Sequence, residues 1–104
     1  MMAKWFDAGL TENLGDGQTK SLAAGRRMIA VARSGAAFFA FEDICTHDGA
    51  PLTGGEIEGG EIICPRHGAR FCLRTGEALS PPAYEPVRVF ETKIEHGHLW
   101  VLAD

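Results

Sequence analysis

Two short segments of the chain each combine one cysteine with one histidine. The first has the pattern Cys45-x-His47, and the second, after 16 intervening residues, has the pattern Cys64-x-x-His67. Each segment offers one thiolate and one imidazole, and iron binds both kinds of ligand. Both segments read as loops between strands. The sequence therefore predicts a metal site built from two neighbouring loops.

A single zinc ion is the main alternative occupant of such a site, because two thiolates and two imidazoles also satisfy tetrahedral zinc. Zinc modules usually keep like ligands together, as C-x-x-C and H-x-x-x-H pairs, whereas each pair in this chain is mixed. A second alternative is that these residues bind no metal, in which case two cysteines and two histidines would have to fall into this order by chance. The pattern favours iron, and a structural zinc site stays open.

The residues around the two segments resemble a known family. Residues 45–52, CTHDGAPL, look like the first cluster-binding loop of the Rieske family, and residues 64–68, CPRHG, look like the second. The resemblance implies one Rieske-type 2Fe-2S cluster with four ligands: Cys45, His47, Cys64 and His67. The cysteines would hold an inner iron, and the histidines an outer iron near the surface. Electrons would enter and leave at the histidine edge.

The length of the chain limits what such a cluster could serve. With 104 residues the chain is expected to form one domain, residues 1–104, that buries about 65% of its unfolded surface. Terminal Rieske oxygenases add a domain with a mononuclear iron held by two histidines and a carboxylate. Beyond the two segments only His96 and His98 remain, and they read as an exposed hairpin tip. A stand-alone electron carrier is favoured.

Composition narrows the partners and the compartment. The chain has 45% hydrophobic and 23% charged residues and a formal charge of −4, which is typical of a mildly acidic soluble protein and does not favour nucleic acid as a partner. No stretch approaches the ~20 apolar residues of a membrane span, and residues 1–7 include charges. We expect a cytoplasmic protein without membrane partners. The third cysteine, Cys72, is expected in a strand, partly buried.

Short apolar runs separated by turns predict an all-β fold. The resemblance implies the Rieske fold, an antiparallel β-sandwich or barrel base with a small cluster-binding subdomain. Residues 43–84, which hold the four candidate ligands and most of the prolines, are predicted to form that subdomain, inserted in the base. The predicted strands are 4–8, 19–23, 26–32, 37–42, 61–64, 69–73, 87–95 and 98–102. An irregularity is expected within 87–95, where Phe90 and Ile94 break the alternation.

The loops lack the residues that raise the potential in Rieske proteins of respiratory complexes. Those proteins carry an extra cysteine in each loop, at places that match Ala50 and Arg66, and hydroxyl donors at places that match Ala69 and Phe71. Hydrogen bonds to sulfur stabilise the reduced cluster. The resemblance therefore implies a low potential, toward the end of the Rieske range near about −150 mV. Arg66 and Phe71 are expected to shape the exposed tip.

Two further features near the loops have two readings each. Gly49 and Gly68 follow the histidines and could bring backbone N–H groups close to inorganic sulfur, or could be ordinary turn glycines. The segment 81–83, Pro-Pro-Ala, resembles the proline-containing third loop that packs over the cluster, or is a rigid connector.

Taken together, the resemblance implies a soluble Rieske ferredoxin. It would carry one electron at a time from an NAD(P)H-dependent flavoprotein reductase to a terminal non-haem iron oxygenase of a ring-hydroxylating dioxygenase system. The protein itself would make no bonds, and no catalytic residue is predicted. An alternative of a different class is a structural or interaction module, or an accessory subunit, with a Cys2His2 zinc or cluster site.

Overall fold

The computed structural model describes residues 2–104, and these form ten strands and one short 3-10 turn. The elements, in chain order, are β1 (Lys4–Leu10), η1 (Thr11–Asn13), β2 (Thr19–Ala24), β3 (Arg27–Ser34), β4 (Ala37–Glu42), β5 (Ile57–Glu58), β6 (Glu61–Ile63), β7 (Arg70–Cys72), β8 (Val89–Phe90), β9 (Thr92–Glu95) and β10 (His98–Ala103). None of these residues belongs to a helix that could cross a lipid bilayer.

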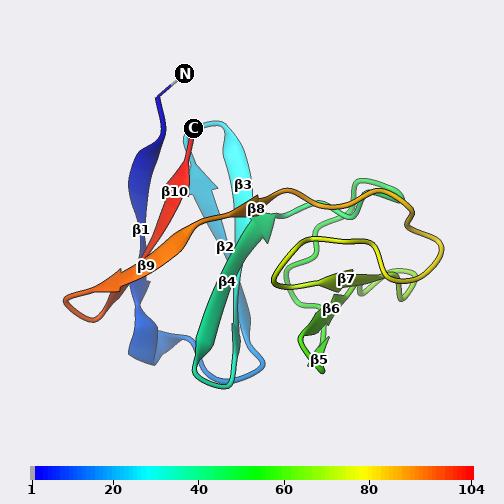
Figure 1. The fold of residues 1–104 in the computed structure, drawn as a ribbon, viewed down its shortest axis with the longest axis horizontal. Coiled ribbons are helices and arrows are strands. Elements are labelled where there is room, and N and C mark those ends of the chain that lie inside the picture. The colour runs from blue at the N-terminus through cyan, green and yellow to red at the C-terminus, as the bar shows by residue number, and fades with distance from the viewer. Residues whose placement is uncertain (1) are drawn as a thin grey trace.

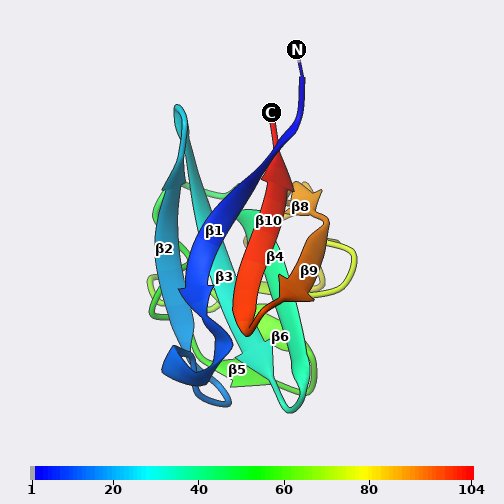
Figure 2. The same ribbon diagram turned by 90° about the vertical axis from the view of Figure 1, so that its left-hand side faces the viewer.

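The strands form three antiparallel sheets that lie one behind the other. The first sheet has the order β1-β10-β9, the second β2-β3-β4-β8, and the third β5-β6-β7. Figure 1 shows the four-stranded sheet in the middle, with the first sheet on one side and the third sheet, with its long loops, on the other. In Figure 2 the first sheet faces the viewer and covers the middle one. The predicted all-β fold is confirmed.

Strand β3 explains why the middle sheet can have a neighbour on each face. Four consecutive residues, Ile29 to Ala32, are buried, so both faces of the strand are covered. Ile29 and Val31 belong to the core shared with the first sheet. Ala30 and Ala32 belong to the core shared with the third sheet and its loops. Small side chains on this second face allow the loops to approach closely.

The two cores differ in what they hold in place. The first and middle sheets together form the base of the molecule. The core between them has the buried members Ala8, Leu14, Ala24, Ile29, Val31, Ala40, Phe90, Leu99, Val101 and Ala103. The other core joins the base to residues 45–87: its buried members are Ala30, Ala32, Phe41, Cys45, Leu52, Ile62, Cys64, Ala69, Phe71, Leu73, Ala83 and Val87. Two cysteines are therefore part of the packing that attaches the loops.

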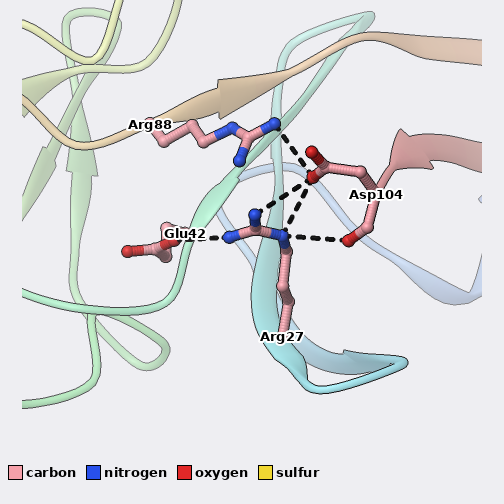
Figure 3. A network of polar contacts seen from close by, with 4 residues as sticks. All are labelled: Arg27, Glu42, Arg88 and Asp104. Carbon is pink, nitrogen blue, oxygen red and sulfur yellow. Dashed lines mark hydrogen bonds and ion pairs between the residues drawn. The ribbon is translucent and has the colours of Figure 1, made fainter. Parts of the chain in front are cut away.

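A network of ion pairs lies where the chain leaves and re-enters the base (Figure 3). Arg27, at the start of β3, lies 3.3 Å from Glu42, which ends β4, and 3.1 Å from Asp104. Arg88, just before β8, lies 3.0 Å from the same Asp104 oxygen, and its guanidinium lies 5.0 Å from the centre of the Phe90 ring. The network ties the segment after β10 to both ends of the inserted loops.

The structure also corrects the predicted strands. The single strand predicted for 87–95 is divided at Glu91: β8 pairs with β4 in the middle sheet, whereas β9 pairs with β10 in the first sheet. The broken alternation at Phe90 marks this change of sheet. The short strand β5 and the turn η1 were not predicted, because two or three residues are too few to show a period.

Candidate metal centre

The first Cys/His segment forms a tight turn that begins at its cysteine. The N–H of Cys45 donates to the carbonyl oxygen of Ala50 over 2.6 Å, and the N–H of Gly49 donates back to the carbonyl oxygen of Cys45 over 2.7 Å. These two bonds close a six-residue loop. His47 lies at the tip of the loop and is exposed.

The second segment forms the same turn. The N–H of Cys64 donates to the carbonyl oxygen of Ala69 over 2.7 Å, and the N–H of Gly68 donates to Cys64 over 3.0 Å. The two loops thus share one hydrogen-bond pattern and length. Each fixes its cysteine at the base of a turn and its histidine at the tip.

The glycines of these loops serve the turn itself. Gly49 has φ 79° and Gly68 has φ 76°, a conformation that residues with a Cβ rarely adopt. Their N–H groups donate to the carbonyl oxygens of Cys45 and Cys64, inside each turn. Of the two readings in the sequence, the structure supports ordinary turn glycines.

The four candidate ligands form two pairs, with the thiols inside and the imidazoles outside. Cys45 is 0% exposed and Cys64 is 1% exposed, and both belong to the core that attaches the loops to the base. The rings of His47 and His67 meet edge to face, with centroids 5.2 Å apart, and the His67 side chain is 46% exposed. The two sulfur donors therefore lie in the interior, and the two imidazole rings lie at the surface.

The chemistry of the thiols fits a bound metal. Burial raises the pKa of the Cys45 thiol, and the neighbouring Cys64 raises it further, although the N–H groups of His47 and Asp48 act in the opposite direction. A buried thiolate needs positive charge nearby, and iron supplies it by binding the sulfur. Two adjacent buried thiols are therefore a suitable donor pair for a cationic group.

The arrangement of the four candidate ligands helps to distinguish a single zinc ion from a two-iron cluster. Within residues 2–104, no three side chains of Cys, His, Asp or Glu are close enough together to hold one metal ion. A tetrahedral zinc ion needs all of its ligands around one point, whereas a two-iron cluster divides four ligands between two metals. The separate imidazole pair and thiol pair suit such a division.

A carboxylate connects the two loops. Asp48, which follows His47, places Oδ2 3.3 Å from Nδ1 of His67 and 3.6 Å from Nε of Arg66. The N–H of Ala50 donates to its other oxygen over 3.0 Å. That N–H is the largest cause that holds the pKa of Asp48 below its ordinary value, with a further contribution from Arg66. Sequence reasoning missed this role, because nothing local indicates a contact with the second loop.

A third loop repeats the turn of the first two. The N–H of Cys72 donates to Glu77 over 2.9 Å, and the N–H of Gly76 donates to Cys72 over 2.7 Å; Gly76 has φ 79°. Hydrogen bonds from Thr75, its hydroxyl first, lower the pKa of the Cys72 thiol. Cys72 is partly buried in β7, as predicted. The spacing Cys-x-x-x-Gly, which occurs at 45–49, 64–68 and 72–76, could have revealed the repeat.

The segment after the third loop lies against the first one. The hydroxyl of Thr46 donates to the carbonyl oxygen of Glu85 over 2.7 Å, and Ala83 is buried in the same core as the cysteines. Between these anchors Tyr84 is 80% exposed. An open groove beside the histidine edge is lined by Thr46, His47, Pro82, Tyr84 and Glu85.

The structure confirms the predicted position of Arg66 and corrects that of Phe71. The Arg66 side chain is 63% exposed, at the tip as predicted. Phe71 is buried, so the prediction that it shapes the tip is wrong: it faces the core from β7, where it is paired with Ile62 of β6. His96 lies in the turn between β9 and β10, whereas His98 belongs to β10 and lies 3.0 Å from Asp7. The β9–β10 hairpin, which carries both residues, belongs to the first sheet, and this sheet lies on the other side of the middle sheet from the loops (Figure 1).

Known proteins are similar to this chain in sequence and in fold. The sequence model of the family described as the Rieske [2Fe-2S] domain matches residues 4–91. The anthranilate 1,2-dioxygenase ferredoxin subunit of Burkholderia cepacia is 35% identical over 100 residues, which cover 96% of this chain and 93% of that protein.

Two solved structures are similar over nearly their full length. A chain in the complex of reduced oxygenase and oxidized ferredoxin in carbazole 1,9a-dioxygenase has a TM-score of 0.88 and 35% identity, and the match covers 93% of this chain and 91% of that one. The Sphingomonas yanoikuyae B1 ferredoxin has a TM-score of 0.90 and 26% identity, with 97% and 100% covered.

Proposed function

This chain belongs to the Rieske [2Fe-2S] domain family, and we propose that it is the ferredoxin component of a multicomponent dioxygenase system. It carries single electrons from an NAD(P)H-dependent flavoprotein reductase to a terminal non-haem iron oxygenase. The observation that supports this role best is the pair of exposed imidazole rings above a pair of buried thiols. Such an arrangement places a redox group just below the surface.

We assign one Rieske-type 2Fe-2S cluster to the two loops. Its proposed ligands are Cys45, His47, Cys64 and His67. When bound, this cluster supplies reversible one-electron transfer. The thiols anchor the cluster on the core side, and the loop turns fix both cysteines at equal positions in equal hydrogen-bond rings. The histidines bring the ligand shell to the surface.

The partners would meet the protein at this histidine edge. Within residues 2–104, His47 and His67 are both exposed, so a docked protein can contact the ring edges directly. A similar structure is that of a ferredoxin in complex with an oxygenase, which supports an oxygenase as the electron acceptor. A flavoprotein reductase as the donor and a cytoplasmic site of action are further parts of the proposal.

The loops support a low potential. Ala69 and Phe71 have no hydroxyl to donate to sulfur, and Ala50 and Arg66 cannot form a disulfide between the loops. Both features leave the reduced cluster with less stabilisation than in high-potential Rieske proteins. Electrons that originate from a nicotinamide can still reach such a cluster and continue to an oxygenase.

Reconstitution tests the role of the protein. The chain, purified with its cluster, is mixed with NADH and with the reductase and oxygenase of the anthranilate 1,2-dioxygenase system, and product formation is measured. We expect turnover that depends on this chain and a midpoint potential near about −150 mV. A midpoint potential well above zero would exclude the ferredoxin role, whatever the rate of turnover with this oxygenase.

A further inference from the structure

The carboxylate of Asp48 occupies a special position among the charges of the loops. It belongs to the first loop but reaches the second, where its Oδ2 lies 3.3 Å from Nδ1 of His67. Among residues 2–104, the arginine that pairs with Asp48 is Arg66, at 3.6 Å. Asp48 thus places a negative charge directly beside one of the two proposed nitrogen ligands.

This charge is fixed in place by the backbone. The N–H of Ala50 donates to Oδ1 over 3.0 Å, within the same turn that holds Cys45. The side chain of Asp48 is 20% exposed, so solvent reaches it only in part. A carboxylate that is held by its own loop keeps its position when neighbouring side chains rearrange.

The arginine beside it compensates this charge only in part. The Arg66 side chain is 63% exposed, whereas the Asp48 side chain is 20% exposed. Water and salt screen an exposed charge more strongly than a partly buried one. The contact between Asp48 and His67 is also shorter than that between Asp48 and Arg66. At His67, Arg66 therefore offsets the charge of Asp48 only in part.

A negative field acts on the redox equilibrium without any bond being made or broken. Reduction adds one electron to the cluster, from the reductase or from dithionite, and makes the cluster more negative. Nearby negative charge opposes this addition. We propose that Asp48 lowers the reduction potential of the bound cluster by favouring its oxidised form. This inference rests on the proposed function, since it requires the cluster to be present.

The test is a spectroelectrochemical titration of the cluster-loaded protein. Asp48→Asn removes the charge and keeps an oxygen that can accept from Ala50. At the midpoint potential of the natural protein, we expect the ratio of reduced to oxidised cluster to be at least threefold higher in this variant. For a one-electron couple, threefold corresponds to about 28 mV.

The matched control removes a carboxylate charge from the base instead of from the loops. Glu12 is exposed on the base, in η1, and Glu12→Gln is expected to leave the ratio within about 1.5-fold of the natural protein. If Asp48→Asn shifts the ratio no more than Glu12→Gln does, the inference is overturned. Should Asp48→Asn fail to take up the cluster, Asp48→Ser, which also keeps an acceptor oxygen, is titrated under the same criterion.

The titration separates this inference from the proposed function. A natural protein without iron and sulfide would reject the proposed function itself. A natural protein with a low-potential cluster, together with an unshifted Asp48→Asn variant, would reject only the role of Asp48. A raised potential with an unchanged electron paramagnetic resonance spectrum would support an electrostatic effect over a change of ligands.

Discussion

At the scale of single residues, Gly49 and Gly76 share a backbone conformation but differ in their surroundings. Both have φ 79° in the same kind of turn. A Cβ at Gly49 would have no atom within 4 Å, whereas a Cβ at Gly76 would collide with the carbonyl oxygen of Val87. Substitutions at these two glycines therefore distinguish the free-energy cost of the left-handed conformation from that of a steric clash.

Alanine at these two positions should therefore have very different effects. We expect Gly49→Ala to cost about 1 kcal/mol, because only the left-handed conformation is strained. Gly76→Ala should cost more than about 4 kcal/mol, since a backbone atom would have to move. The measurement is the Tm, for which 1 kcal/mol corresponds to roughly 4–8 °C in a domain of this size. Equal losses at both positions would show that the contact with Val87 relaxes easily.

The thiol of Cys72 should be more reactive than an ordinary cysteine. Because the Thr75 hydroxyl and two backbone N–H groups lower its pKa, its thiolate forms at a lower pH and reacts with iodoacetamide there. Thr75→Val should move the pH midpoint of alkylation upward, as followed by mass spectrometry of the Cys72 peptide. An unchanged midpoint would assign the shift to the backbone alone.

At the scale of elements, β3 holds the loops to the base. Ala30 is buried on the face that contacts the loop core, which includes both Cys45 and Cys64. Ala30→Leu should overpack this contact and cost about 1–3 kcal/mol. We also expect less iron per chain, because the loops can no longer pack fully against β3. The control is Ala23→Leu on the exposed side of β2, and equal iron contents in the two variants would contradict this account.

The elements also show how far sequence reasoning reaches. The Cys/His spacing identified the loops, and alternation identified most strands, because both signals are local. The division at Glu91 depends on which sheet each half joins, and this is decided by packing. The bonds from Thr46 to Glu85 and from Asp48 to His67 join separate loops. Such contacts have no local pattern, and the sequence does not predict them.

At the scale of the whole molecule, the loops that carry the exposed His47 and His67 form the surface that we expect to meet another protein. Tyr84 is the exposed aromatic residue at this end, held between buried Ala83 and the bond from Thr46 to Glu85. Rigid aromatic side chains contribute strongly at interfaces. Tyr84 is therefore expected to contact the oxygenase beside His47.

Loss of this side chain should slow electron transfer without changing the potential. We expect Tyr84→Ser to lower the second-order rate constant for reduction of the carbazole 1,9a-dioxygenase oxygenase by roughly 5–30-fold, which is about 1–2 kcal/mol. Stopped-flow absorbance measures this rate. The control is Ile94→Ser, since Ile94 is an exposed apolar residue of β9 in the base. Similar rates for both variants would exclude Tyr84 from the contact.

Pulsed electron paramagnetic resonance of the dithionite-reduced protein tests the central claim, mixed cysteine and histidine ligation of a 2Fe-2S cluster, most directly. Our account predicts two irons and two acid-labile sulfides per chain, with magnetic coupling to two histidine nitrogens that falls to one in His67→Cys. One zinc ion per chain without a signal, or a cluster with no coupled nitrogen, would contradict it.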